Sequence, residues 1–247
     1  MFKLIAFDMD GTLAPSKGQM DPEMTDLFKK LLTKYKVAII SGGDYVQFEK
    51  QVISFLGDDE NILKNLFILP TCGTKLYKFE NKNWQKIYSL DFTLEERQYI
   101  VKVLEDAIID LDLKPETIWG KQVEDRGTQI TFSALGQEAP LEVKHTWDRD
   151  QEKRKRIRNY ILKDLQNFNI LIGGSSSIDI TKSGVDKAYG MKKLNEILDI
   201  SLDEMIFVGD AIFPGGNDYP PLTIGVTSKK VETIEDTKKY IKTLITN

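Results

Sequence analysis

Short apolar runs, each ending in polar turn residues, recur in the first third of the chain and again near its end. They cover residues 4–7, 35–40, 66–70, 205–208 and 222–226. Apolar residues at helical spacing lie between these runs, with a terminal helix expected at 231–244. A run that is apolar throughout is typical of a parallel strand covered by helices on both faces. The alternation therefore predicts an α/β protein with a doubly wound, Rossmann-like parallel sheet.

The pattern changes between residues 89 and 186. There we expect a helix, two strands, a second helix and two more strands, at 93–111, 118–124, 129–133, 147–168, 170–172 and 178–180. Thr93 and Glu96 have the spacing of a capping box at the first of these helices. This order predicts an α+β domain, residues 89–186, inserted into a core formed by residues 1–88 and 187–247.

Two carboxylates, Asp8 and Asp10, follow the first apolar run, and the turn Gly11-Thr12 follows them. The carboxyl ends of parallel strands form the edge at which open α/β sheets bind ligands. Two acids there can hold Mg²⁺, while one carboxylate oxygen attacks phosphorus and the other acid moves a proton. An ordinary aspartate-rich turn is the alternative, because Asp and Gly are common turn residues.

Three other segments carry polar residues suited to a phosphate. Ser41-Gly42-Gly43 follows the second run and can present a hydroxyl and main-chain N–H groups to phosphate oxygens. Lys187 supplies a positive charge for the phosphate and the nucleophile, and Asp210 supplies a further oxygen ligand. Each alone could be a plain turn or helix-start residue. Together they predict phosphoryl transfer catalysed by positioning and charge neutralisation.

Composition limits the partners. Of the 247 residues, 41% are hydrophobic and 29% charged, and the formal net charge is −4. Such a chain is typical of soluble globular proteins and has no global basic surface for nucleic acid. A single cysteine, Cys72, excludes an intrachain disulfide, and neither an apolar stretch of about 18 residues nor a signal segment is present. We therefore expect a cytoplasmic protein without a nucleic-acid or membrane partner.

The stretch from Asp8 to Thr12 resembles the first motif of the haloacid dehalogenase (HAD) superfamily, whose members are mostly phosphatases and phosphotransferases. The resemblance implies that Asp8 is the nucleophile and a Mg²⁺ ligand. It implies that Asp10 is the general acid/base and a ligand through its main-chain carbonyl, and that Thr12 supports the turn at the phosphate site. Ser41, Lys187 and Asp210, the third metal ligand, follow the order of the superfamily's other motifs. Asn217 and Asp218 match the last motif, in which an acid orients metal-bound water or the lysine.

A finer resemblance is to the eukaryotic-type phosphomannomutases, which carry a type IIB cap. Residues 173–187 are similar to that family's cap-to-core segment, and residues 207–219 are more similar still. The resemblance implies that the inserted domain is a cap and that Arg126, Ser177 and Asp179 bind the sugar and its distal phosphate. The family uses three cap arginines for that phosphate. Here only Arg126 matches, and Gln137 and Lys144 occupy the other two places.

These differences from the family's cap residues determine the order of three hypotheses about function. The first is a Mg²⁺-dependent phosphatase of small phosphorylated metabolites, with sugar phosphates expected as substrates and a phospho-aspartyl intermediate on Asp8. A phosphomannomutase or other hexose phosphate mutase with the same core is the alternative, and a non-catalytic phosphosugar-binding protein is a remote one. Lys144, Gly42, Gly43 and Asn217 complete the predicted substrate contacts. Trp119, Phe132 and Trp147 could stack on a sugar, fill the core of the cap or form a homodimer surface.

Overall fold

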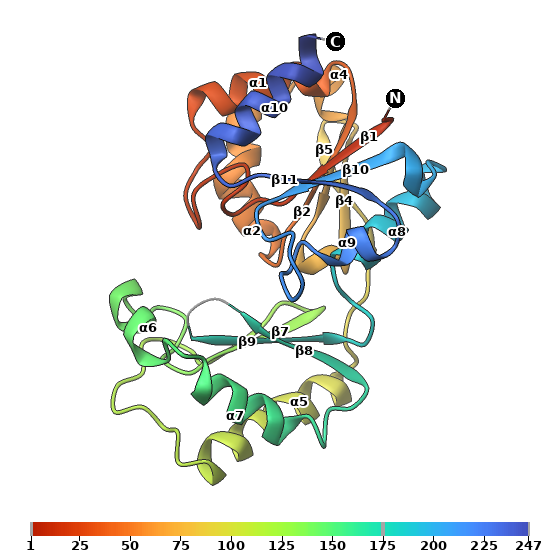
Figure 1. The fold of residues 1–247 in the computed structure, drawn as a ribbon. Coiled ribbons are helices and arrows are strands. Elements are labelled where there is room, and N and C mark those ends of the chain that lie inside the picture. The colour runs from red at the N-terminus through yellow and green to blue at the C-terminus, as the bar shows by residue number, and fades with distance from the viewer. Residues whose placement is uncertain (1, 174–175, 247) are drawn as a thin grey trace. The chain divides into compact units, whose positions relative to one another are not determined.

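Five parallel strands form the larger part of the first sheet (Figure 1). They are β1 (Leu4–Phe7), β2 (Lys36–Ile40), β3 (Leu66–Leu69), β10 (Met205–Gly209) and β11 (Thr227–Lys230). The antiparallel hairpin of β4 (Lys75–Glu80) and β5 (Asn83–Ser89) extends it, in the order β11-β10-β1-β2-β3-β4-β5. The computed structural model describes residues 2–173 and 176–246; Gly174 and Ser175 of the family-like segment 173–187 lie outside the described residues.

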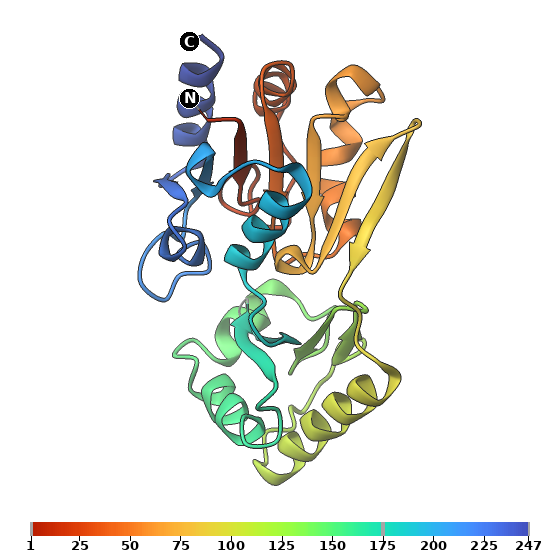
Figure 2. The same ribbon diagram turned by 90° about the vertical axis from the view of Figure 1, so that its right-hand side faces the viewer.

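Alternate residues of each central strand pack on opposite faces of this sheet. Ile5 and Phe7 of β1 pack with α1 (Pro22–Leu32) and α10 (Ile234–Thr246), whereas Leu4 and Ala6 pack on the side of α8 (Lys187–Leu198). Figure 2 shows α8 lying over its face of the sheet. The predicted doubly wound α/β sheet is confirmed, with the hairpin making it mixed rather than purely parallel.

The helix expected between the apolar runs 35–40 and 66–70 is interrupted by a π-helical turn, which is wider than an α-helical one. It consists of α2 (Tyr45–Phe48), a π-helical turn η1 (Glu49–Ile53) and α3 (Ser54–Leu56), and α4 (Glu60–Leu63) follows. The Ser54 hydroxyl donates to the Glu49 carbonyl at 2.7 Å within the turn. Such π turns occur frequently at functional sites because the extra residue changes which side chains share a helix face.

The last strand was predicted wrongly at 222–226. Pro220 and Pro221 instead begin a short helix, α9 (Pro220–Thr223), because proline suits the first turn of a helix and cannot donate to a sheet. The strand that closes the sheet is β11, and its four residues are polar and partly or fully exposed because it is an edge strand. Two short 3₁₀ turns, η2 (Thr71–Gly73) and η3 (Leu202–Glu204), complete the elements of this part of the chain.

The chain divides into two units, one comprising the residues up to Ser89 and from Val185 onward, the other Leu90–Gly184. The second unit has an antiparallel sheet in the order β6-β7-β9-β8. Its strands are β6 (Val123–Asp125), β7 (Gln129–Ser133), β8 (Phe168–Gly173) and β9 (Ser177–Lys182). Helices α5 (Leu94–Asp110) and α7 (Glu152–Ile161) pack on one face of it (Figure 1). The Thr93–Glu96 capping box at α5 is confirmed. No helix in residues 2–173 or 176–246 is both long and apolar enough to cross a bilayer.

The helix predicted at 147–168 is present but shorter, because α7 covers only Glu152–Ile161, and the separate helix before it was not predicted. Helix α6 (Leu141–Trp147) ends before Asp148, and α7 begins at Glu152. The buried Asp148 carboxylate accepts the main-chain N–H groups of Lys153 and Arg154 at 2.9 and 3.1 Å. It also accepts Nε of Arg154 at 2.7 Å, and this buried ion pair holds the pKa of Asp148 below its usual value, although burial alone would raise it.

Asp148→Ala is expected to lower the free energy of unfolding by about 3 kcal/mol, because it leaves the buried Arg154 guanidinium without its carboxylate. Urea unfolding followed by tryptophan fluorescence measures the change. The difference from the unmutated protein should shrink as the pH falls below about 4, because Asp148 of the unfolded wild-type chain binds a proton there while the folded carboxylate still carries its charge. Glu142→Ala, an exposed acid on α6, is the matched control and should change stability by less than about 0.5 kcal/mol. Equal effects of the two variants would contradict this account.

Candidate active site

The strand order brings three of the predicted residues to one edge of the sheet. β10, β1 and β2 are neighbours and run parallel, so the residues that follow them, Asp210, Asp8 and Ser41, lie side by side. Lys187 is the first residue of α8, which packs on the same sheet. The fold therefore gathers side chains that are up to about 200 residues apart in the chain, at the edge where α/β sheets bind ligands.

Lys187 lies between two buried carboxylates. Its Nζ donates to Oδ1 of Asp8 at 2.5 Å and to Oδ1 of Asp218, and the three residues are between 0 and 4% exposed. Burial alone would lower the pKa of Lys187, but the two carboxylates raise it above its usual value, so the ammonium is charged. Burial raises the pKa of Asp8, an effect that Lys187 opposes and Asp218 increases.

Asp210 joins Asp8 and Asp218 in a cluster whose nearest carboxylate oxygens lie within 4.8 Å of one another. Burial and the charge of Asp218 raise the pKa of Asp210. The cluster suits a hard divalent cation such as Mg²⁺, which prefers oxygen ligands and would offset the excess of negative charge. Asp218 already uses Oδ1 for Lys187 and Oδ2 for the Ala211 N–H at 3.0 Å. Asp8 and Asp210 are therefore better able than Asp218 to bind the metal ion through a carboxylate oxygen.

Gly11 makes this cluster sterically feasible. Its φ of +85° is in the left-handed region, and a Cβ there would lie 2.5 Å from Oδ2 of Asp210. A side chain at position 11 would therefore strain the backbone and displace the carboxylate. Thr12 is fully buried beside it, and its hydroxyl lies 3.4 Å from Oδ2 of Asp8, at the long limit of a hydrogen bond.

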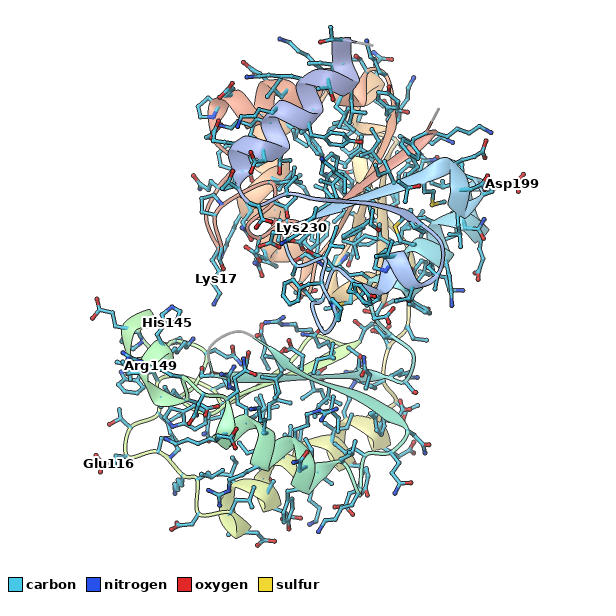
Figure 3. All side chains as sticks on the ribbon, in the orientation of Figure 1. Lys17, Glu116, His145, Arg149, Asp199 and Lys230 are labelled. Carbon is cyan, nitrogen blue, oxygen red and sulfur yellow. The ribbon has the colours of Figure 1, made fainter. Side chains whose placement is uncertain are left out.

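The Asp10 side chain points to a different set of partners. Gln47 donates Nε2 to Oδ2 of Asp10 at 3.0 Å, Gln51 donates Nε2 to Oδ1 at 3.0 Å, and the main-chain N–H of Lys17 donates to Oδ1 at 2.8 Å. The Lys17 side chain itself is exposed (Figure 3). Neither glutamine was predicted as a site residue from the sequence. The available signal was two glutamines four residues apart on the predicted helix that follows Ser41-Gly42-Gly43.

The loop after β2 is closely packed. Ser41 is buried, its hydroxyl accepts the Gly43 N–H at 3.3 Å, and the Gly43 carbonyl accepts the Thr71 N–H at 2.9 Å. Gly42 is partly exposed, whereas Asn217 is exposed in the loop beside the buried Asp218. A contact of these residues with substrate stays a prediction.

Four other predicted residues lie in the inserted unit. Arg126 donates Nη2 to Oε2 of Glu124 at 2.7 Å, and its charge also acts on Asp179. Asp179 accepts the Thr131 hydroxyl at 2.7 Å; burial raises its pKa despite that bond. Ser177 lies at the start of the same strand, β9. Lys144 is buried on α6 and donates Nζ to the Gln137 carbonyl at 2.8 Å.

The three aromatic candidates for a sugar-stacking face have different surroundings. Phe132 is 3% exposed and belongs to the apolar cluster under α5 and α7, and Trp147 packs partly against that cluster. Lys153 places its ammonium over the Trp147 ring. Trp119 contributes main-chain groups to the turn at Gly136, where a Cβ would lie 2.0 Å from the Trp119 carbonyl oxygen. Of the three alternatives for these aromatic residues, Phe132 therefore fills the core of the inserted unit.

Comparison with known proteins agrees with this geometry. A family model described as eukaryotic phosphomannomutase matches residues 24–247. A phosphomannomutase of Schizosaccharomyces pombe is 28% identical over 249 residues, which cover 96% of this chain and 93% of that protein. The IMP-bound IMP-nucleotidase of Plasmodium falciparum superposes with a TM-score of 0.69 at 18% identity, over 100% of this chain and 68% of that one.

A haloacid dehalogenase-like hydrolase from Bacteroides thetaiotaomicron has a TM-score of 0.63 at 14% identity, over 99% of this chain and 100% of that one. At such identities the solved structures show a common fold, whereas the family match rests on sequence along nearly the whole chain. The protein therefore shares its fold with a haloacid dehalogenase-like hydrolase, and it is an enzyme that belongs to the eukaryotic phosphomannomutase family.

Proposed function

We propose that the protein is a Mg²⁺-dependent phosphatase of small phosphorylated metabolites, with sugar phosphates as substrates. The observation that carries this proposal is the buried Asp8 carboxylate, held by Lys187 beside two further acids at the carboxyl edge of the sheet. An anionic nucleophile in such a site needs a cation on one side and a general acid nearby. Lys187 and Asp10 supply these functions in the proposal.

The reaction proceeds in two steps on the side chains of this chain. A carboxylate oxygen of Asp8 attacks the phosphorus, the bond from phosphorus to the ester oxygen breaks, and Asp10 gives its proton to that oxygen. Asp10, now a carboxylate, takes a proton from water as the water attacks the phosphorus of the aspartyl phosphate. Orthophosphate leaves and both acids return to their starting states. When bound by Asp8, Asp210 and the Asp10 carbonyl, Mg²⁺ would neutralise the charge that the phosphoryl group brings.

The charges of the inserted unit favour hydrolysis over mutase activity. A mutase has to hold a hexose bisphosphate, and therefore needs cations for a second phosphate. Arg126 is paired with Glu124, Gln137 is neutral, and the Lys144 ammonium donates to a main-chain carbonyl. Lysine also lacks the planar fork with which arginine binds phosphate at two oxygens. A phosphatase requires only the phosphate site of the core.

The family match favours the second candidate, a phosphomannomutase, so one assay should compare both. The protein is incubated with mannose 1-phosphate and Mg²⁺, with and without a hexose 1,6-bisphosphate. Free phosphate and mannose 6-phosphate are measured together. We expect free phosphate without need of the bisphosphate, and a loss of about a thousandfold or more in Asp8→Asn. Bisphosphate-dependent mannose 6-phosphate with little free phosphate would establish the mutase instead.

The role of Lys187 predicts a linked change in stability and activity. Lys187→Met leaves the buried Asp8 and Asp218 carboxylates without a cation, so we expect a loss of about 3 kcal/mol in unfolding free energy and no turnover. Adding Asp218→Asn removes one of the two charges and should restore part of the stability but none of the activity. Urea midpoints and phosphate release measure the two quantities. A double variant no more stable than Lys187→Met would show that lost packing, rather than charge, causes the change.

The metal assignment predicts a change in Mg²⁺ requirement. Asp210→Asn should raise the Mg²⁺ concentration for half-maximal phosphate release by about tenfold or more, because one anionic ligand is lost. Chelation with EDTA should abolish the activity of the unmutated protein, and added Mg²⁺ should restore it. Asp203→Asn, an exposed acid of the same unit, is the control and should leave the requirement unchanged. An unaltered requirement in Asp210→Asn would remove Asp210 from the metal site.

A further inference from the structure

Both oxygens of the Asp10 carboxylate are held by side-chain amides. Gln47 Nε2 donates to Oδ2 and Gln51 Nε2 donates to Oδ1, each at 3.0 Å, and the Lys17 N–H adds a bond of 2.8 Å to Oδ1. A carboxylate bound at one oxygen can still rotate about its Cβ–Cγ bond. Donors on both oxygens fix that rotation, so they determine the direction in which Asp10 presents its proton.

The two glutamines lie on the interrupted helix that follows β2, and one of them is in its π-helical turn. Gln47 lies in α2 and Gln51, four residues later, lies within η1. Gln51 is 2% exposed, and its main-chain carbonyl accepts the Met20 N–H at 3.0 Å, which ties the turn to the loop after the first motif. Burying a glutamine amide is costly unless it has partners. The Gln51 Nε2 donates to Asp10 and, at 3.4 Å, to the Pro15 carbonyl, whereas its Oε1 is buried without a hydrogen-bond partner among the described residues.

Gly43 provides the space for the Gln47 amide. A Cβ at position 43 would lie 2.4 Å from Oε1 and 2.7 Å from Cδ of Gln47. The φ of Gly43 is outside the left-handed region, so its backbone conformation is open to other residues. The absence of a side chain is thus required by the close approach of Gln47. This gives Gly43 a role that differs from the phosphate contact predicted from the sequence.

We propose that Gln47 and Gln51 are positioning residues that orient Asp10 for proton transfer, and that Gly43 is needed to admit Gln47. This assignment rests on the proposed function, because it concerns the proton that Asp10 gives to the leaving oxygen. Neither glutamine touches the substrate in this account; each acts through the Asp10 carboxylate. The amide nitrogen is the group required, since an oxygen acceptor facing a carboxylate would repel it.

The dependence of rate on the leaving group tests this role. An alkoxide leaves phosphorus only with a proton from the general acid, whereas p-nitrophenolate leaves unaided. Gln47→Met keeps the length of the side chain and removes the donor. We expect its kcat/KM to fall by about 10- to 100-fold for the sugar phosphate that the wild type hydrolyses fastest, and by less than about threefold for p-nitrophenyl phosphate. Gln51→Met should behave in the same way, and Gln85→Met, an exposed glutamine on the edge strand β5, should match the wild type.

A double-mutant cycle tests the link to Gly43. Gly43→Ala should lower sugar-phosphate hydrolysis much as Gln47→Met does, because the new methyl group displaces the amide. The double variant should then be no slower than either single variant, since both remove one interaction. Multiplied effects would overturn the assignment of Gly43.

Failure of this proposal differs from failure of the proposed function. Equal losses on both esters would mean that the glutamines support the site in general, and would overturn the assignment while the phosphatase remains. A wild-type protein that releases phosphate from neither ester would contradict the proposed function, and the positioning role would be rejected with it.

Discussion

Two buried carboxylates and a third, partly buried one lie close to one ammonium group, and this is the constraint on which the rest of the site depends. Asp8 and Asp218 are almost fully buried, and both accept from the Lys187 ammonium, whereas Asp210 has a carboxylate oxygen within 4.8 Å of theirs. Removing carboxylates from water is costly unless cations and hydrogen bonds compensate. The cluster therefore has an excess of negative charge, which a divalent cation and the approach of a phosphoryl group would address together.

Glycines let the backbone bring these charges together. A Cβ on Gly209, the last residue of β10, would lie 2.4 Å from Oδ2 of Asp218, as a Cβ on Gly11 would lie 2.5 Å from Asp210. Position 216 also has no room for a side chain, because a Cβ there would lie 2.0 Å from the Ala211 carbonyl oxygen. The loop from Ala211 to Asp218 can thus fold back on the strand end and direct Asp218 toward Lys187. The acidic cluster is a property of the main-chain path as much as of the acids.

The sequence predicted the parts of this molecule that local pattern determines. The apolar runs predicted the buried strands. Because parallel strands end at the same edge of a sheet, the sequence alone predicted that Asp8, Ser41 and Asp210 lie close together. Contacts made across the fold were not accessible in this way. The amide bonds from Gln47 and Gln51 to Asp10 join a helix to the turn after β1, and periodicity does not indicate which turn a helix face contacts. Strand β11 was missed because an edge strand has no apolar run. The start of α7 was predicted too early, because periodicity does not show that the Asp148 side chain accepts N–H groups of the first turn of α7.

Family membership and activity are separate conclusions, because they depend on different residues. The family match spans residues 24–247 and so reflects the common fold and core. In the proposed mechanism, the fate of the phosphoryl group depends on whether water or a second hydroxyl attacks the aspartyl phosphate, and the cations of the inserted unit determine how firmly a bisphosphate is bound. In the inserted unit Arg126 is balanced by Glu124 and acts on Asp179, so its positive charge is largely compensated within the unit. A chain of this fold can therefore keep the family's nucleophile and lysine while lacking the cations that a mutase needs to bind a second phosphate.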